Sequence, residues 1–160
     1  MREILFRGQT RKNGEKVKIA TGEKVPGHWV YGGIFPGTGD YSIIYGGETE
    51  ADLEKHAVYS ETVGQYTGLK DKNGKRIFEG DVLRIAKIVD GLGGYCHPPL
   101  DYPVNVVVKW DLCAWMWETL CEDKRYISFP NAWSHYECEI IGNIHDNPEL
   151  LEGGAHLNDQ

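Results

Sequence analysis

The sequence ETVGQYTGLKDKNGKRIFEGDV, which spans Glu61–Val82, decides the fold class of this chain of 160 residues. Its glycines divide the stretch into segments that are too short for helices: Gly64, Gly68, Gly74 and Gly80. Glycine at such points commonly adopts positive backbone angles that other residues resist. The stretch therefore predicts short strands joined by tight turns.

Turn chemistry is strongest at two places within this stretch. In Asp71–Gly74 (DKNG) the Asp and Asn side chains can bond nearby backbone amides, and the glycine accepts a left-handed conformation. Closing this turn places Leu69 and Ile77 on the same core face. A second tight turn at Glu79–Asp81 (EGD) then starts the next strand. The residues predicted to form this structural turn motif are Gly68, Asp71, Gly74, Glu79, Gly80 and Asp81.

The rest of the chain also favours strands over helices. It contains 20 glycines, 7 prolines and 11% aromatic residues, a composition typical of turn-rich β proteins. Val82–Val89 and Val104–Trp110 are predicted to pair, with a long exposed loop between them at Asp90–Pro103. An Asn-Gly pair at Asn13–Gly14 predicts a hairpin turn. Further strands are expected at His28–Tyr31, Tyr41–Tyr45, Tyr126–Phe129 and Glu137–Ile141.

Two segments have helical signals. Glu48–His56 has acidic residues in its first turn and Lys-His in its last, which predicts a short surface helix. Asn147–Leu151 predicts a helical turn capped by Asn147, with Pro148 at its first position and two leucines that anchor the end. The expected fold class is mainly β, a small barrel-like antiparallel β architecture with one or two short helices.

Charge, cysteines and hydropathy restrict the function classes. The formal net charge of -7 argues against a broad phosphate-binding face. The cysteines form no C-x-x-C pair, so neither a zinc ribbon nor a disulfide framework is indicated. No apolar run approaches the roughly 20 residues that cross a bilayer. We therefore expect a cytoplasmic protein without membrane association. The cysteines are Cys96, Cys113, Cys121 and Cys138.

Carboxylates around the turns raise the question of a catalytic or metal site. Glu61, Asp71, Glu79 and Asp81 could hold a metal or perform acid–base chemistry if two of them met near one reacting atom. A turn role is favoured for them, because each has a local structural task and no metal-ligand spacing is present. The adjacent Cys96–His97 pair is read as an incidental exposed thiol. We therefore assign no catalytic, cofactor-binding or metal-binding residue.

Aromatic residues are concentrated between Trp110 and Tyr136. Such side chains can stack on bases or anchor a protein partner, and they can equally fill a core. Core packing is favoured for Trp115 and Trp117, which share one face of a strand, and interface use is the strongest functional alternative. The candidate interaction surface comprises Trp110, Trp115, Trp117 and Trp133.

Several of these motifs together resemble the YopX family of phage and prophage proteins. The resemblance rests on Glu61–Val82 and on IIGNIHDNPELL at Ile140–Leu151, with FRG at Phe6–Gly8 and WVYG at Trp29–Gly32. It covers nearly the whole chain apart from the tail, and this chain departs from the family mainly in a longer segment at Asn13–His28 and in the Gly/Pro loop at Asp90–Pro103. It implies a mainly β fold with barrel-like character, a location in the cytoplasm of a bacterial host cell that carries phage or prophage DNA, and no established activity. It brings no catalytic site with it.

These observations predict a single YopX-like domain at residues 1–151, with an N-terminal lobe (1–58) and a C-terminal barrel-like lobe (59–151), followed by a flexible tail (152–160). The leading hypothesis is a non-enzymatic accessory protein that forms a homo-oligomer or binds a phage or host protein. The alternative is a nucleic-acid-associated small-barrel module, which the net charge disfavours. An enzyme that uses Glu79 or Asp81 is the weakest hypothesis. No cofactor is expected.

Overall fold

The chain forms two compact units, the first unit at residues 1–68 and the second unit at residues 69–160. The computed structural model describes residues 4–11, 26–37, 39–46, 54–88, 103–111, 114–120, 126–128 and 136–152. The boundary between the two lobes that was predicted from the sequence lies ten residues earlier, after residue 58. In the structure β5 (Gly64–Lys70) begins in the first unit, because it pairs there with β1 (Phe6–Arg11).

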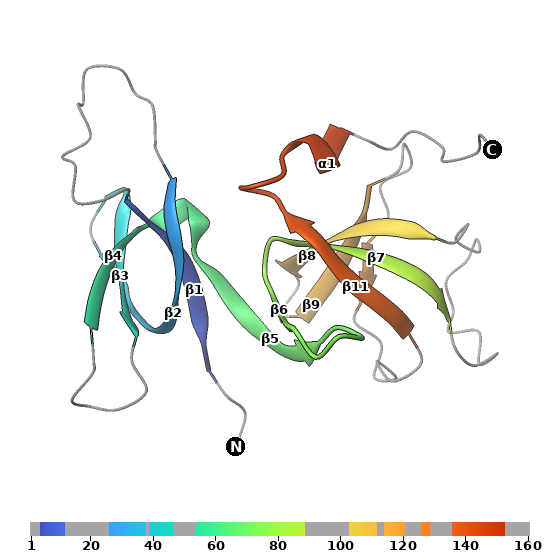
Figure 1. Ribbon diagram of the computed structural model, residues 1–160, viewed down its shortest axis with the longest axis horizontal. Helices are drawn as coiled ribbons and strands as arrows, with labels where there is room; N and C mark the ends of the chain where they lie inside the picture. Colours follow the sequence, from blue (N-terminus) through green and yellow to red (C-terminus); the bar gives the residue numbers. More distant parts are fainter. Residues whose placement is uncertain are drawn as a thin grey trace. The chain divides into compact units, whose positions relative to one another are not determined.

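Four antiparallel strands close into a ring in the first unit. Strand β1 pairs with both β2 and β4, while β3 pairs with the same two neighbours. Figure 1 shows the four strands wrapped around one another. The remaining elements of the ring are β2 (Pro26–Phe35), β3 (Tyr41–Gly46) and β4 (Glu54–Tyr59), after which the short 3-10 helix η2 (Ser60–Thr62) leads into β5.

The interior of this ring is small and partly lined by glycine. Val30, Ile44 and Val58 form its buried cluster, against which Phe6 and Val63 pack. A Cβ added at Gly8 would lie 2.9 Å from Cβ of Val58. Strands that approach this closely leave no room for larger inward side chains, so the bulky residues of β2 and β3 must point elsewhere.

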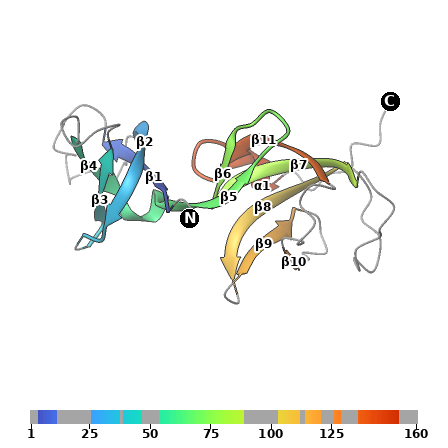
Figure 2. The same cartoon turned by 90° about the horizontal axis from the view of Figure 1, so that it is seen from below.

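The second unit is built on an antiparallel sheet with the strand order β10-β9-β8-β7-β11. Figure 2 shows β8 and β9 as a curved hairpin beside β7. The predicted pairing of the strands after residues 82 and 104 is confirmed, with Leu83 opposite Val106. The elements are β6 (Arg76–Phe78), β7 (Asp81–Ile88), β8 (Val104–Asp111), β9 (Ala114–Thr119), β10 (Tyr126–Ser128), β11 (Tyr136–Asn143) and α1 (Glu149–Glu152).

One face of this sheet forms the larger core. Ile77 lies in it and Leu69 packs against it, so both residues of the predicted hairpin face the same core. Alternate residues of β7, β8 and β9 supply most of the remainder, as a half-buried strand pattern requires. The buried cluster consists of Ile77, Leu83, Ile85, Val106, Val108, Trp115, Trp117 and Cys138.

The mainly β, antiparallel architecture expected from the sequence is confirmed. The closed ring of four strands lies in the first unit, whereas the barrel-like lobe was expected at residues 59–151. The glycines of the central stretch differ in role. Gly68, Gly74 and Gly80 have positive φ angles of 88°, 80° and 80°, whereas Gly64 lies in β5 without one.

The helix predicted at Glu48–His56 is wrong in its described part, because Glu54–Tyr59 form β4. Pairing along the whole of β3, from Tyr41 opposite Tyr59 to Gly46 opposite Glu54, outweighs the charge pattern that favoured a helix. Residues 48–53 lie outside the described residues, as do residues 90–102 of the predicted loop, the Asn13–Gly14 turn and the tail after residue 152.

The C-terminal helical turn is present as α1, but its predicted contacts differ. Nδ2 of Asn147 donates to Glu149 Oε1 at 3.2 Å, and its Oδ1 accepts from the Asn143 amide at 3.4 Å instead of capping the helix. Leu150 lies against Gly142, whereas Leu151 is 42% exposed and does not anchor the end. No helix in the described part of the chain has the length and apolarity to cross a membrane.

Candidate functional site

The outward side of the ring in the first unit carries the most exposed aromatic residues that the structure describes. Side chains alternate along each strand, so the neighbours of the inward Val30, Ile44 and Val58 point outward. The register places Phe35 opposite Ile43 and Tyr45 opposite Lys55 on this side.

We call this surface the aromatic face. Two of its members are among the large apolar side chains most open to solvent, with Tyr31 50% and Phe35 61% exposed. The others are half-buried or exposed. Exposed apolar patches of this kind commonly mark sites of protein association. The aromatic face consists of Tyr31 and Phe35 from β2, Tyr41, Ile43 and Tyr45 from β3, and Lys55 and Ala57 from β4.

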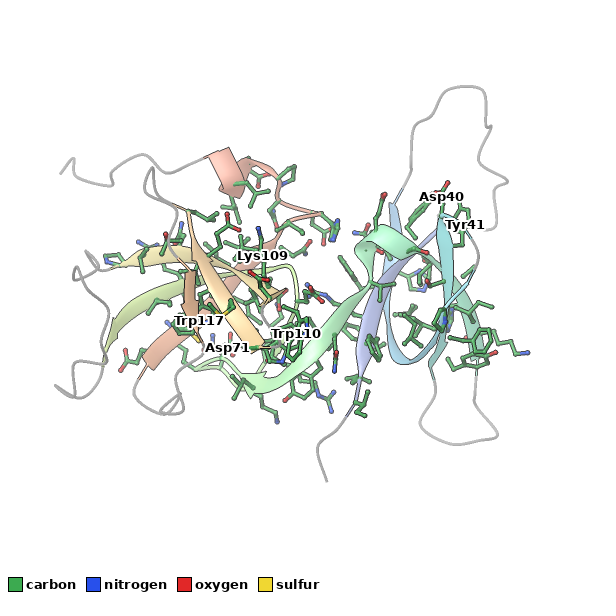
Figure 3. All side chains as sticks on the ribbon, turned by 180° about the vertical axis from the view of Figure 1, so that it is seen from behind. Asp40, Tyr41, Asp71, Lys109, Trp110 and Trp117 are labelled. Carbon is green, nitrogen blue, oxygen red and sulfur yellow. The ribbon has the colours of Figure 1, made fainter. Side chains whose placement is uncertain are left out.

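Ring contacts give the aromatic face a defined shape. The rings of Tyr41 and Tyr59 lie 5.5 Å apart between centroids at an interplanar angle of 38°. Nζ of Lys55 lies 5.7 Å from the centroid of Tyr45, within the range of a cation–π interaction. Figure 3 shows Tyr41 beside Asp40 at the start of β3. Among the members of the face, Lys55 carries the formal charge.

A second cation–aromatic pair lies next to the aromatic face. The guanidinium of Arg7 is 4.7 Å from the ring centroid of Trp29, and Arg7 stands opposite Tyr31 in the β1–β2 pairing. Arg7 is buried, with 7% of its surface exposed, so its charge is largely withdrawn from solvent. This pair therefore lies on the outward side of the ring beside Tyr31, and because Arg7 is buried it adds little positive charge to the surface.

Gly33 leaves a shallow gap in the centre of the aromatic face. It lies between Tyr31 and Phe35 on β2 and opposite Tyr45 on β3. A Cβ added at Gly33 would meet no atom within 4 Å. The neighbouring Gly32 differs completely, because a Cβ there would lie 1.8 Å from the carbonyl oxygen of Tyr45. Gly32 thus permits the close approach of β2 to β3, whereas Gly33 keeps the surface of the aromatic face flat.

The four tryptophans predicted as an interaction surface are divided by the structure. Trp115 and Trp117 lie in the core with 8% and 1% exposure, whereas Trp110 is 49% exposed. Trp110 meets the edge of Trp115 across the β8–β9 hairpin at 4.9 Å between centroids. Figure 3 labels Trp110 and Trp117 in the second unit. Trp133 lies outside the described residues, so within them this surface is reduced to Trp110.

Asp71 connects the predicted DKNG turn to a distant strand. Its Oδ1 accepts hydrogen bonds from the amides of Asn73 and Lys75, both at 2.9 Å, and its Oδ2 accepts one from Ile140 of β11 at 3.2 Å. Burial raises the pKa of Asp71, but the hydrogen bonds from these amides outweigh that effect and lower the pKa from its ordinary value. The carboxylate is thereby committed to holding the backbone.

Asp81 has a comparable task at the second turn. It is 1% exposed, and its Oδ2 accepts a hydrogen bond from the amide of Phe78 at 2.8 Å. The Gly80 amide donates to the carbonyl of Val108, and the Gly80 carbonyl accepts from the amide of Ile144, both at 2.9 Å. The turn thus bonds to β8 and to the segment after β11. Glu79 is half-buried beside it.

Ionisable groups elsewhere in the second unit form pairs across strands and turns. Lys109 is paired with Glu118 across the β8–β9 hairpin, and the Glu118 side chain is only 5% exposed. Lys72 in the DKNG turn is paired with Glu139 at the surface.

Burial raises the pKa of the Cys138 thiol to about 12, which makes it a poor nucleophile. The described residues contain no group of three or more His, Cys, Asp and Glu side chains that could hold a metal ion.

The sequence predicted the strands that carry the aromatic face, but it did not predict that their aromatic residues lie together on one surface. Alternation of bulky residues at His28–Tyr31 and Tyr41–Tyr45 predicted strands there, and both are strands. Alternation shows that two sets of side chains point in opposite directions, yet it does not show which set enters the core. The glycine-lined interior decides this, because it admits only the smaller set.

Comparison with known proteins places the chain in a family. The crystal structure of protein EF1440 from Enterococcus faecalis is similar at 22% sequence identity and a TM-score of 0.45, with 94% of this chain and 99% of that chain covered. None of the curated proteins compared matches the chain. The model of the YopX protein family matches residues 38–152, which include β3, the central turns and α1. The chain belongs to the YopX family.

Proposed function

We propose that this chain is a phage- or prophage-encoded accessory protein with a non-enzymatic role, in which the aromatic face binds another protein. Membership in the YopX family supports the proposal, since the motifs of this chain resemble phage and prophage proteins of that family. The observation that carries it is the exposure of Tyr31 and Phe35 on one sheet face.

The composition of the aromatic face resembles the centre of a protein interface. Such centres are rich in Tyr and Phe and poor in charged residues. Tyrosines are also over-represented among the residues that dominate binding energy. Here the face holds three tyrosines, one phenylalanine and one isoleucine, with a single lysine opposite Tyr45. Tyr31, Phe35 and Tyr45 flank the gap at Gly33.

Nucleic acid is the competing occupant of the same surface. Tyr45 with Lys55 above its ring could stack on a base, as aromatic platforms do in single-strand binding proteins. Such binding also requires cations that neutralise several phosphates. The face offers Lys55, while Arg7 nearby is buried, so a protein partner is favoured.

Site-specific photo-cross-linking in the cells that make the protein tests this proposal. A benzophenone amino acid replaces Phe35 in one variant and Trp110, in the second unit, in a matched control, since both positions are exposed aromatics. Irradiation should join the Phe35 variant to a protein, with much less adduct from the Trp110 variant. Equal adducts from both positions, or nucleic acid as the captured molecule, would contradict the proposal.

A further inference from the structure

We propose that the partner of the aromatic face is a second copy of this chain, bound face to face about a two-fold axis. This inference rests on the proposed function and adds the identity of the partner. It is carried by the shape of the face, by its area and by the way charge is divided between the two units.

The shape of the aromatic face suits a sheet-to-sheet contact. Gly33 leaves its centre flat, with open space where a side chain would stand. Tyr31 and Phe35 project on either side of that centre from the same strand. In a two-fold arrangement an aromatic ring of one copy can occupy the Gly33 gap of the other, and the reciprocal contact follows by symmetry.

The available area fits a reversible dimer. An aromatic side chain contributes roughly 150–250 Å², so the exposed parts of Tyr31 and Phe35 in two copies provide on the order of 400 Å². The half-buried members of the face raise the total towards the lower limit of specific interfaces, about 1,200 Å². We therefore expect an association in the micromolar range that depends on protein concentration.

Charge favours approach through the first unit. Residues 1–68 contain eight Lys and Arg against nine Asp and Glu, whereas residues 69–160 contain nine against fifteen. The first unit is therefore nearly neutral, and the second carries most of the net charge of -7. Two copies repel one another least where their first units meet. A strongly acidic partner or a nucleic acid would instead need a positive surface.

This charge distribution gives the self-association a distinctive salt dependence. Added salt screens the repulsion between the acidic second units and leaves the apolar contact intact, so the dimer should strengthen as salt is raised. Binding of nucleic acid to Lys55 and its neighbours would weaken under the same change. The sign of the salt effect therefore separates the two occupants.

The test combines light scattering after size exclusion with two variants of equal charge. Gly33→Glu fills the gap of the face, and the added Cβ meets no atom within 4 Å. Gln65→Glu on β5 introduces the same charge in the first unit, opposite Phe6, which packs on the inner cluster and is not part of the aromatic face. Gly33→Gln repeats the steric change without charge. Circular dichroism establishes that all three variants keep the β structure of the wild-type chain.

The wild-type chain should pass from monomer to dimer as its concentration rises, and more readily at high salt. Gly33→Glu and Gly33→Gln should raise the dimer dissociation constant by about tenfold or more, as expected at the centre of an interface, while Gln65→Glu should behave like the wild type. A wild-type monomer at the highest concentration, equal dimerisation of the Gly33 variants, or a dimer weakened by salt would overturn this inference. If the Phe35 cross-linker then captured a different protein, the proposed function would stand and the second copy would be excluded as its partner.

Discussion

Adjacent glycines in β2 illustrate how single residues define both the ring and its surface. Gly32 and Gly33 are indistinguishable in sequence terms, yet an added methyl group would strike the Tyr45 carbonyl oxygen at Gly32 and meet nothing at Gly33. The difference arises from the register of β2 with β3. It could not be predicted from the sequence, because register depends on the closure of the whole ring.

Substitution of these glycines should therefore have opposite results. Gly32→Ala should lower the free energy of unfolding by about 3 kcal/mol, since the strands must separate to admit the methyl group. Gly33→Ala should change it by less than about 0.5 kcal/mol. Urea denaturation followed by circular dichroism measures both variants. Equal losses would show that the two glycines are not distinguished by packing.

Asp71 gives a prediction that depends on pH. In Asp71→Asn one oxygen can still serve the turn, but an amide group facing Ile140 loses that hydrogen bond, so we expect a loss of about 2 kcal/mol at pH 7. The lowered pKa means that the carboxylate stabilises the fold above the ordinary value of 3.8. This contribution is lost as the pH falls through the pKa of the folded state.

The measurement is the unfolding free energy of both proteins across the acidic range. Wild type and Asp71→Asn should differ by a constant amount near neutrality and converge in acid. A difference that does not change with pH would show that Asp71 acts through its shape and not through its charge.

Secondary-structure elements were predictable where local pattern and tertiary pairing agree. The β-branched run of β8 and the alternation of β7 identified two strands and their pairing. Residues Glu54–Tyr59 had a polar, charged start that favours a helix, but β3 provides a partner along the full length of β4. Tertiary pairing outweighed the local preference there, and the sequence alone contains no sign of that partner.

The β8–β9 hairpin contains an ion pair whose importance follows from burial. Lys109→Met would leave the Glu118 carboxylate, 5% exposed, without this cation, and should cost about 3 kcal/mol. The matched control Lys72→Met breaks a pair at the surface with Glu139, where both side chains are partly exposed, and should cost clearly less. Chemical denaturation compares the two, and an equal effect would contradict the distinction drawn from burial.

On the scale of the whole molecule, the sequence predicted the family, the β class and the excess of acidic residues. It did not predict that tryptophans of β9 would fill the core while tyrosines of β2 and β3 remain outside. Large aromatic residues serve both purposes equally well, and the choice depends on the volume enclosed by each sheet. The candidate surface therefore lies on the ring of the first unit and not around Trp110, because the narrow interior of the ring excludes the tyrosines of β2 and β3.

Hydroxyl-radical footprinting over a concentration series tests most directly whether the ring surface is where the molecule makes contact. Oxidation of Tyr31, Phe35 and Tyr45 should fall as the protein concentration rises, while oxidation of Trp110, which is also exposed, should stay constant. Constant oxidation of the three ring residues with protection of Trp110, or equal protection of both regions, would contradict the assignment of the aromatic face.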